Sequence, residues 1–116
     1  MDRAPVTVVE FKAFLANAKM LFSDEERDAL IEFLSYNPMA GVVIKGTGGI
    51  RKLRWGAKGK GKSGGARAIY FYHDDEMPLF LLTAYGKNQK ADIEPEEKAE
   101  FRELIDELVS SYRRPI

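Results

Sequence analysis

Hydrophobic residues in the N-terminal third of the chain follow two different spacings. Residues 6–10 form a short run rich in β-branched side chains, which is typical of a strand. Phe11, Phe14, Leu15 and Ala18 then recur at helical spacing. The pattern therefore predicts a strand followed directly by a helix.

Start and stop signals predict a second helix. Ser23 is followed three positions later by Glu26, which is the pattern of a capping box. Apolar residues within 30–34 continue at helical spacing, and the segment ends where Asn37 precedes Pro38, because proline disfavours helical backbone in the residue before it. The two segments together predict a helical hairpin.

The middle of the chain begins with a strand pattern. Within residues 50–55, Leu53 and Trp55 share one face and Lys52 and Arg54 share the other. We interpret Trp55 as a core residue rather than a base-stacking platform, because it shares its face with Leu53.

Two further strands are predicted by the aromatic and aliphatic runs at 68–72 and 79–85. The polar segment 73–78 between them has the composition of a hairpin loop. No segment long enough for a helix separates the strand runs from 50 to 85, so neighbouring strands should be antiparallel.

A final helix is predicted to begin near Pro95, a favoured residue in a first helical turn. One apolar stripe at helical spacing follows, made of Phe101, Leu104, Ile105, Leu108, Val109 and Tyr112. The predicted order is β-α-α-β-β-β-α, in the α+β class. We expect one domain over residues 1–116, with a small antiparallel β-sheet, an N-terminal helical hairpin and a C-terminal helix.

Composition narrows the range of functions. The 116 residues include no cysteine and one histidine, so thiolate metal sites, cysteine nucleophiles and sites built from several histidines are excluded. No apolar run approaches the ~20 residues that span a bilayer, and the N-terminus lacks the layout of a signal peptide. We expect a cytoplasmic protein without a membrane partner.

The formal net charge of zero hides a segregation of charge along the chain. Residues 45–67 carry eight basic side chains and no acid, whereas residues 92–107 carry eight acids and only two basic side chains. Local charge decides which partners a surface attracts, so the basic segment indicates binding to nucleic acid. The alternative is a solvated basic loop.

The basic segment also contains a P-loop pattern, GAKGKGKS at residues 56–63. A working P-loop needs a helix directly after it, whose first amides point at the phosphates. Here two glycines and a predicted strand follow instead. We interpret the segment as a glycine-rich basic hairpin loop.

Three segments together resemble a known superfamily: GTGGIRKLRW (46–55), GKGKSGGARAIYFY (59–72) and LLTAYGKNQKADI (81–93). In order and spacing they are similar to the RelE/ParE toxins, and within these to the HigB-type toxins of bacterial type II toxin–antitoxin pairs. The family fold is a small antiparallel sheet with two N-terminal helices and one C-terminal helix. That fold agrees with the order predicted from the residues.

The resemblance implies a ribosome-dependent endoribonuclease that cuts mRNA and inhibits translation. In toxins of this kind the ribose 2′-OH attacks the adjacent phosphate without a metal or other cofactor. The reaction needs a base for the 2′-OH, cations for the phosphorane and an acid for the leaving 5′-oxygen.

Family position assigns these catalytic roles to five residues: Lys52, Arg54, Arg67, Tyr85 and Lys87. Further RNA contacts are expected from Arg51, Lys58, Lys60, Lys62 and Lys90. Neither a histidine nor a glutamate occupies the position of the base that better-known relatives use, and His73 lies away from these segments. Lys52 is either the base, which requires neighbouring positive charge, or a plain phosphate contact. Tyr85 either stacks on a base or is buried.

The resemblance also implies partners: a HigA-like helix-turn-helix antitoxin, the ribosome and mRNA. The antitoxin either covers the basic segment or contacts the N-terminal helices and blocks entry to the ribosome sterically; we favour the second. Two alternative functions stay open. One is a ParE-like toxin that binds DNA gyrase, and the other is an RNA-binding module without catalysis.

Overall fold

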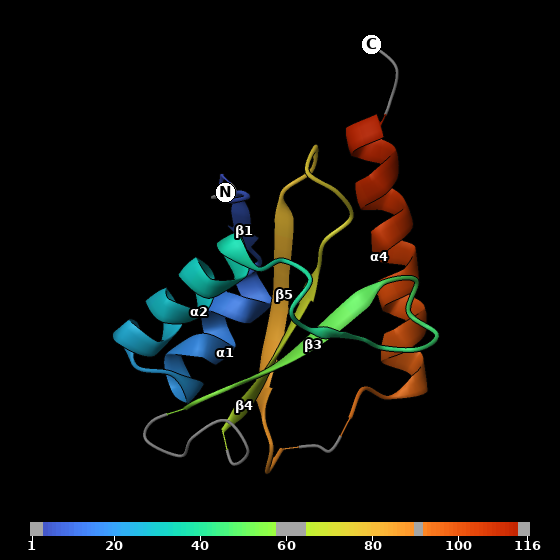
Figure 1. Ribbon diagram of the computed structural model, residues 1–116. Coiled ribbons are helices and arrows are strands. Elements are labelled where there is room, and N and C mark those ends of the chain that lie inside the picture. The colour runs from blue at the N-terminus through green and yellow to red at the C-terminus, as the bar shows by residue number, and fades with distance from the viewer. Residues whose placement is uncertain (1–3, 58–64, 90–91, 114–116) are drawn as a thin grey trace.

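The computed structural model describes residues 4–57, 65–89 and 92–113. Its centre is a five-stranded sheet with the order β1-β5-β4-β3-β2 (Figure 1). The strands are β1 (Val8–Glu10), β2 (Val42–Val43), β3 (Ile50–Trp55), β4 (Ala66–Phe71) and β5 (Leu79–Gly86). β3, β4 and β5 pair antiparallel, as expected. β2 also pairs antiparallel with β3, whereas β1 pairs parallel to β5.

Helices cover both faces of this sheet. α1 (Lys12–Leu21) and α2 (Asp24–Tyr36) pack on one face, and α4 (Pro95–Arg113) lies on the other (Figure 1). Two hydrophobic clusters result. The first joins Phe14 and Leu30 of the helical hairpin to Tyr70 and Leu81 of the sheet. The second includes Ile105 of α4 with the sheet residues that face it. The predicted α+β class is confirmed.

The predicted capping box at the start of α2 is confirmed. The Glu26 N–H donates to Ser23 Oγ at 3.1 Å, and the Ser23 N–H donates to Glu26 Oε1 at 2.8 Å. Such a cap contributes about 1 kcal/mol to helix stability. α2 ends at Tyr36, directly before Asn37. The helical hairpin thus has the boundaries that its local sequence signals predict.

Two features of the sheet differ from the sequence prediction. β1 makes the sheet mixed rather than purely antiparallel, and the two-residue strand β2 adds an element at the opposite edge. Both depend on pairing between distant parts of the chain, which local hydrophobic spacing does not encode. A register shift between Ile69 and Tyr70 leaves Leu82 of β5 without a partner on β4, which is the pattern of a β-bulge.

Buried polar contacts hold the segment between α2 and β2. The fully buried Tyr70 hydroxyl donates to Pro38 O and accepts from the Gly41 N–H, both at 2.8 Å. On the same face of the sheet, Arg51 Nη1 donates to Gly41 O at 2.7 Å and to Met39 O at 3.1 Å. Burial raises the pKa of Tyr70, against the opposing influence of the Gly41 N–H and Arg51.

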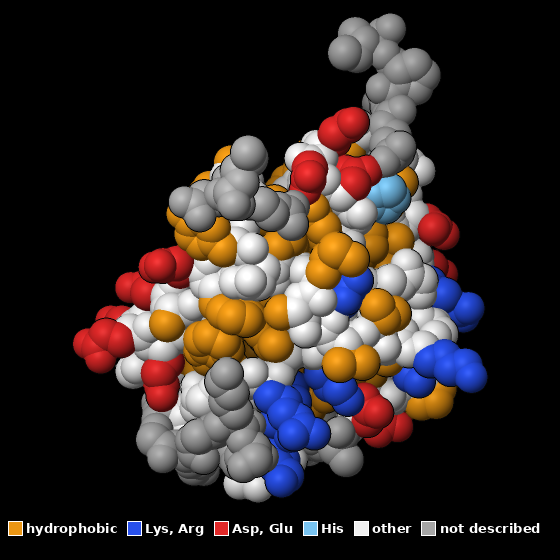
Figure 2. Space-filling model, viewed as in Figure 1, with side chains coloured by type: hydrophobic (Ala, Val, Ile, Leu, Met, Phe, Trp, Pro, Cys, Tyr) orange, Lys and Arg blue, Asp and Glu red, His pale blue; other side chains and the backbone are white. Residues whose placement is uncertain are grey.

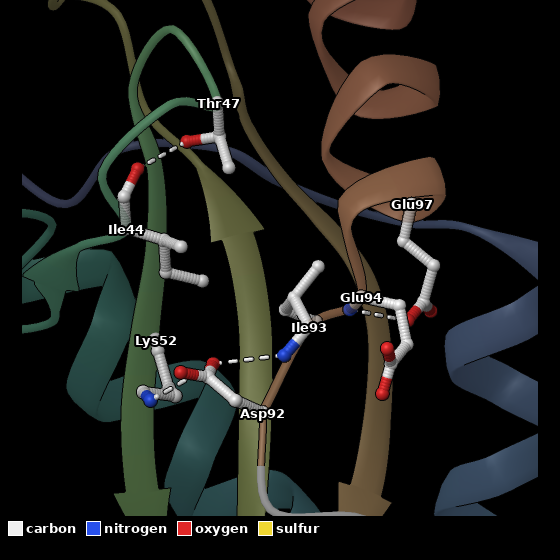
Figure 3. A network of polar contacts seen from close by, with 7 residues as sticks. All are labelled: Ile44, Thr47, Lys52, Asp92, Ile93, Glu94 and Glu97. Carbon is white, nitrogen blue, oxygen red and sulfur yellow. Dashed lines mark hydrogen bonds and ion pairs between the residues drawn. The ribbon is translucent and has the colours of Figure 1, made fainter.

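A second polar contact shapes the loop that leads into β3. Thr47 is fully buried, and its hydroxyl donates to Ile44 O at 2.6 Å (Figure 3). The same hydroxyl accepts from the Ile50 N–H at 3.0 Å. Gly48 and Gly49 after it have φ of 82° and 126°, a backbone conformation that favours glycine. The loop therefore fixes where β3 and its charged side chains begin.

Trp55 is half-buried and packs against the first hydrophobic cluster, on the side of the core as predicted. Its indole N–H donates to Glu26 O at 3.0 Å, and its ring lies 5.3 Å from that of Phe33. Within the described residues, no helix has both the length and the apolar character needed to cross a membrane.

Candidate active site

A row of three side chains crosses three adjacent strands on the α4 face of the sheet. Arg54 of β3 lies opposite Arg67 of β4, and Arg67 lies opposite Tyr85 of β5. Directly opposed residues of antiparallel strands share a face, with Cβ atoms about 5 Å apart. Arg54 is exposed, Arg67 is half-buried and Tyr85 is buried. The row thus runs from open surface into the core.

The fold explains why this row is accessible at one end. β3 starts beside α4 and runs away from it (Figure 1), so the helix packs over the first part of the strand, at Ile50. Arg54 lies four residues further on. In the view of Figure 2, Lys and Arg side chains gather at the lower centre and lower right of the molecule.

Lys52 lies on the same face as Arg54, two residues earlier on β3. Its ammonium group lies 3.3 Å from Asp92 Oδ1, in the segment before α4 (Figure 3). The same oxygen accepts the Ile93 N–H at 2.8 Å. The Ile93 N–H is the main cause of the lowered pKa of Asp92; burial acts in the opposite direction, and Lys52 lowers the pKa further. In the isolated chain Lys52 is therefore paired with a carboxylate.

Tyr85 is the covered end of the row, with a side chain that is 5% exposed. Burial raises the pKa of its hydroxyl, as do the negative charges of Asp92 and Glu97, while Arg67 acts in the opposite direction. The hydroxyl is therefore protonated at neutral pH and suits a proton donor rather than a base. Of the two expectations for Tyr85, stacking on a base and burial, the structure shows burial.

The structure thus brings together four of the five residues expected to be catalytic: Lys52, Arg54, Arg67 and Tyr85. Lys87 follows β5 with an exposed side chain, and its N–H donates to Gly65 O at 3.2 Å.

The residues expected to contact RNA are placed differently. Arg51 lies on the opposite face of β3, where its guanidinium group binds loop carbonyls. The remaining four, Lys58, Lys60, Lys62 and Lys90, lie outside the described residues.

Two other sequence features are separate from the row. The first element described after the P-loop pattern is strand β4 rather than a helix, so the phosphate-binding context is missing. His73 is exposed beyond the far end of β4 from Arg67, and its Nδ1 lies 2.9 Å from Asp74 Oδ2. A catalytic role for His73 at the row is therefore not supported.

Sequence reasoning missed the acidic side of the site. Asp92 and Glu97 come from the acidic segment that begins before α4. In a segment with so many acids, the sequence does not indicate which carboxylates belong to the site. Glu97 Oε1 accepts the Glu94 N–H at 3.0 Å at the start of the helix (Figure 3). Only the packing of α4 beside β3 and β5 selects these two acids, and no local pattern marks them.

The chemistry available at the site is cationic. Among residues 4–57, 65–89 and 92–113, no group of three or more His, Asp and Glu side chains is placed to hold a metal ion. Two arginines opposed on adjacent strands, with Lys52 on the same face, are side chains that bind phosphate groups through charge-assisted hydrogen bonds. The arrangement can therefore bind a phosphate and stabilise added negative charge on it.

A comparison with known families identifies the chain. Residues 40–114, well over half of its length, match the family described as the RelE toxin of the RelE / RelB toxin–antitoxin system. The matched region contains strands β2 to β5, helix α4 and the whole Lys52–Arg54–Arg67–Tyr85 group. Membership implies a toxin with an antitoxin partner. The chain belongs to the RelE toxin family.

Proposed function

We propose that this toxin is a HigB-type, ribosome-dependent endoribonuclease that cleaves mRNA in the cytoplasm without a metal ion. The observation that carries the proposal is a set of three cations on one accessible face. Arg54 and Arg67 of the row are directly opposed, and Lys52 lies beside them. A toxin that acted by binding a protein would not need opposed guanidinium groups on a shared face. A phosphate approaching this face would meet both.

In the proposed reaction the ribose 2′-oxygen bonds to the adjacent phosphorus and the bond from phosphorus to the 5′-oxygen breaks. Arg54 and Arg67 stabilise the negative charge of the phosphorane between these events. The RNA phosphate replaces Asp92 as the partner of Lys52. Lys52 then either contacts the phosphate as an ammonium group or, after it has released one proton to solvent, takes the 2′-OH proton as a neutral amine. The leaving 5′-oxygen receives a proton from Tyr85 or Lys87.

The need for a ribosome follows from the state of the site in the isolated chain. Lys52 is paired with Asp92, and the Tyr85 hydroxyl is covered. Both must be rearranged before they can act on RNA. Binding energy from the ribosome and the positioned mRNA is the proposed source of that rearrangement.

Primer extension on translated mRNA after brief toxin expression tests this function. We expect discrete cuts within codons that depend on the ribosome and disappear in the Arg67→Ala variant. Loss of DNA supercoiling without mRNA cuts would instead indicate a ParE-like gyrase inhibitor. RNA binding without cuts or supercoiling changes would indicate a non-catalytic module.

A further inference from the structure

A polar hollow of about 310 Å³ lies at the edge of the sheet next to the row Arg54–Arg67–Tyr85. β1 pairs with β5 only along Leu79–Leu81, so in the described part of the chain no strand flanks the second half of β5 on that side. The hollow opens there. It is lined by Asn17, Thr83, Ala84, Tyr85, Gln89 and Glu97.

Two side-chain amides of this hollow are each anchored at one end. Gln89 Oε1 accepts the Gly86 N–H at 2.6 Å, and because a backbone N–H can only donate, the Gln89 amino group is left for a ligand. Asn17 Nδ2 donates to Thr83 Oγ1 at 3.0 Å, which leaves the Asn17 carbonyl oxygen. Because the Gly86 N–H fixes the direction of the Gln89 amide, the hollow offers one oriented donor, with the Asn17 amide held beside Thr83.

The location and charge of the hollow indicate what it binds. Tyr85 lines the hollow and is also the β5 end of the row Arg54–Arg67–Tyr85. Since Arg54 lies two strands away on β3, the hollow is about two strand spacings, or about 10 Å, from Arg54. One nucleotide spans a similar distance from its phosphate to its base edge. The carboxylate of Glu97 lines the hollow and repels a phosphate, whereas it does not repel an uncharged base.

We infer that the hollow binds one unpaired nucleobase of the mRNA beside the scissile phosphate and contributes to base preference at that position. Gln89 is the specificity-determining residue, because a donor held in a fixed position can distinguish the edges of different bases. The inference rests on the proposed ribonuclease function and adds a substrate contact to it.

Two matched variants test this assignment. Gln89→Glu keeps an oxygen for the Gly86 N–H but replaces the donor that faces the ligand with an acceptor. Asn17→Asp adds the same negative charge and keeps an acceptor for the ligand, because the Thr83 hydroxyl can donate to the new carboxylate. Any effect of charge alone is therefore common to both variants, and only Gln89→Glu inverts the hydrogen-bonding pattern.

The measurement is the cleavage rate on ribosomes programmed with codons that differ at one base, with circular dichroism to verify folding. We expect Gln89→Glu to change the relative rates of two such codons by about 10-fold or more, and Asn17→Asp to keep the wild-type ranking. Equal changes in both variants, or a uniform change over all codons, would overturn the inference. An unchanged ranking in Gln89→Glu with weakened antitoxin binding would assign the hollow to the protein partner instead. Absence of cuts by the wild-type toxin would overturn the proposed function itself.

Discussion

At the residue scale, the opposed pair Arg54 and Arg67 is unfavourable for the fold. Like charges directly opposite each other on antiparallel strands destabilise a sheet by a few tenths of a kcal/mol or more. Among the described residues, no acid forms an ion pair with either guanidinium group, and Arg67 Nη1 donates only to Ala66 O, at 3.4 Å. Binding of an anionic ligand accounts for the presence of two like charges that oppose folding. In the proposed function, that ligand is the phosphate of the RNA substrate.

Replacing Arg67 with alanine should separate activity from stability. We expect mRNA cleavage to fall about 100-fold or more, since a preorganised cation next to the phosphorane is lost. The melting temperature should stay within about 4 °C of wild type, because the variant also removes a like-charge repulsion. The matched control is Arg102→Ala, an exposed arginine of α4 whose loss should leave cleavage unchanged. Full cleavage by Arg67→Ala would exclude Arg67 from the site.

Lys52 allows a test of its role by exchange of one cation for another. Lys52→Ala should reduce cleavage strongly in either role. Lys52→Arg keeps the charge and the phosphate contact but cannot accept a proton, because arginine stays protonated in proteins. Single-turnover cleavage rates therefore distinguish the roles: failure of arginine to restore the rate indicates the base, and recovery to near the wild-type rate indicates a phosphate contact.

At the element scale, the described secondary structure follows from local sequence signals more closely than the site does. The capping box at Ser23, the limits of β3 and the start of α4 at Pro95 are predicted because each depends on neighbours within a few residues. The alternation within β3 also separates Lys52 and Arg54 from Leu53. The parallel pairing of β1, strand β2 and the Lys52–Asp92 contact depend on tertiary packing, so the sequence alone does not predict them.

The contact between β3 and the segment before α4 gives a prediction for RNA binding. An aspartate is charged at neutral pH, and the lowered pKa of Asp92 keeps it charged, so its carboxylate competes with RNA for Lys52. Asp92→Asn should therefore tighten binding of a short RNA about 2- to 10-fold at low salt. The slope of log Kd against log salt should rise by about 0.7, the value for one added phosphate contact with a single strand. Fluorescence anisotropy at several salt concentrations measures both, and unchanged values would show that Asp92 does not compete.

The same carboxylate has a defined effect on stability at low pH. A carboxyl group whose pKa is lowered by folding stabilises the fold fully above its ordinary pKa of about 3.9, and this contribution is lost as the pH falls through the lowered value. The Asp92 side chain is 58% exposed, so the contribution is small. In urea denaturation, the free energies of unfolding of wild type and Asp92→Asn should be closely similar at pH 7. Below pH ~4, the free energy of unfolding of the variant should depend less on pH than that of wild type.

At the scale of the whole molecule, the sheet separates two surfaces with different character. Lys52, Arg54 and Arg67 lie on the α4 face, while α1 and α2 pack on the other face. Exposed apolar side chains gather near the end of α2 and on β2: Tyr36, Met39 and Val43. Val42 of β2 is exposed as well, but it lies opposite Lys52 and so shares the α4 face. Apolar side chains are visible as patches on the face shown in Figure 2. Separate surfaces allow RNA and a protein partner to bind in different places.

Cleavage by the whole toxin–ribosome complex should not require a divalent ion for the chemical step. In the proposed reaction, Arg54 and Arg67 stabilise the negative charge of the phosphorane, and side chains of the toxin carry out the proton transfers. We expect cuts at an undiminished rate in chelator when a polycation keeps the ribosomes intact, which sedimentation verifies. Recovery of lost cleavage only after a divalent ion is added back, with ribosomes intact throughout, would show that the metal takes part in the reaction.

Antitoxin binding tests whether the two surfaces act separately. A partner on the N-terminal helices blocks entry to the ribosome by its bulk, while a partner on the basic face competes with RNA for the same cations. We favour the first mode, because α1 and α2 lie across the sheet from Lys52 and Arg67 and the exposed apolar residues adjoin α2. Lys52→Ala and Arg67→Ala should then each bind antitoxin within about tenfold of wild type, a change of about 1.4 kcal/mol or less. Isothermal titration calorimetry measures these affinities, with circular dichroism as the check on folding. A collapse of affinity in both folded variants would instead place the antitoxin over the active site, where removal of either cation removes a contact with it.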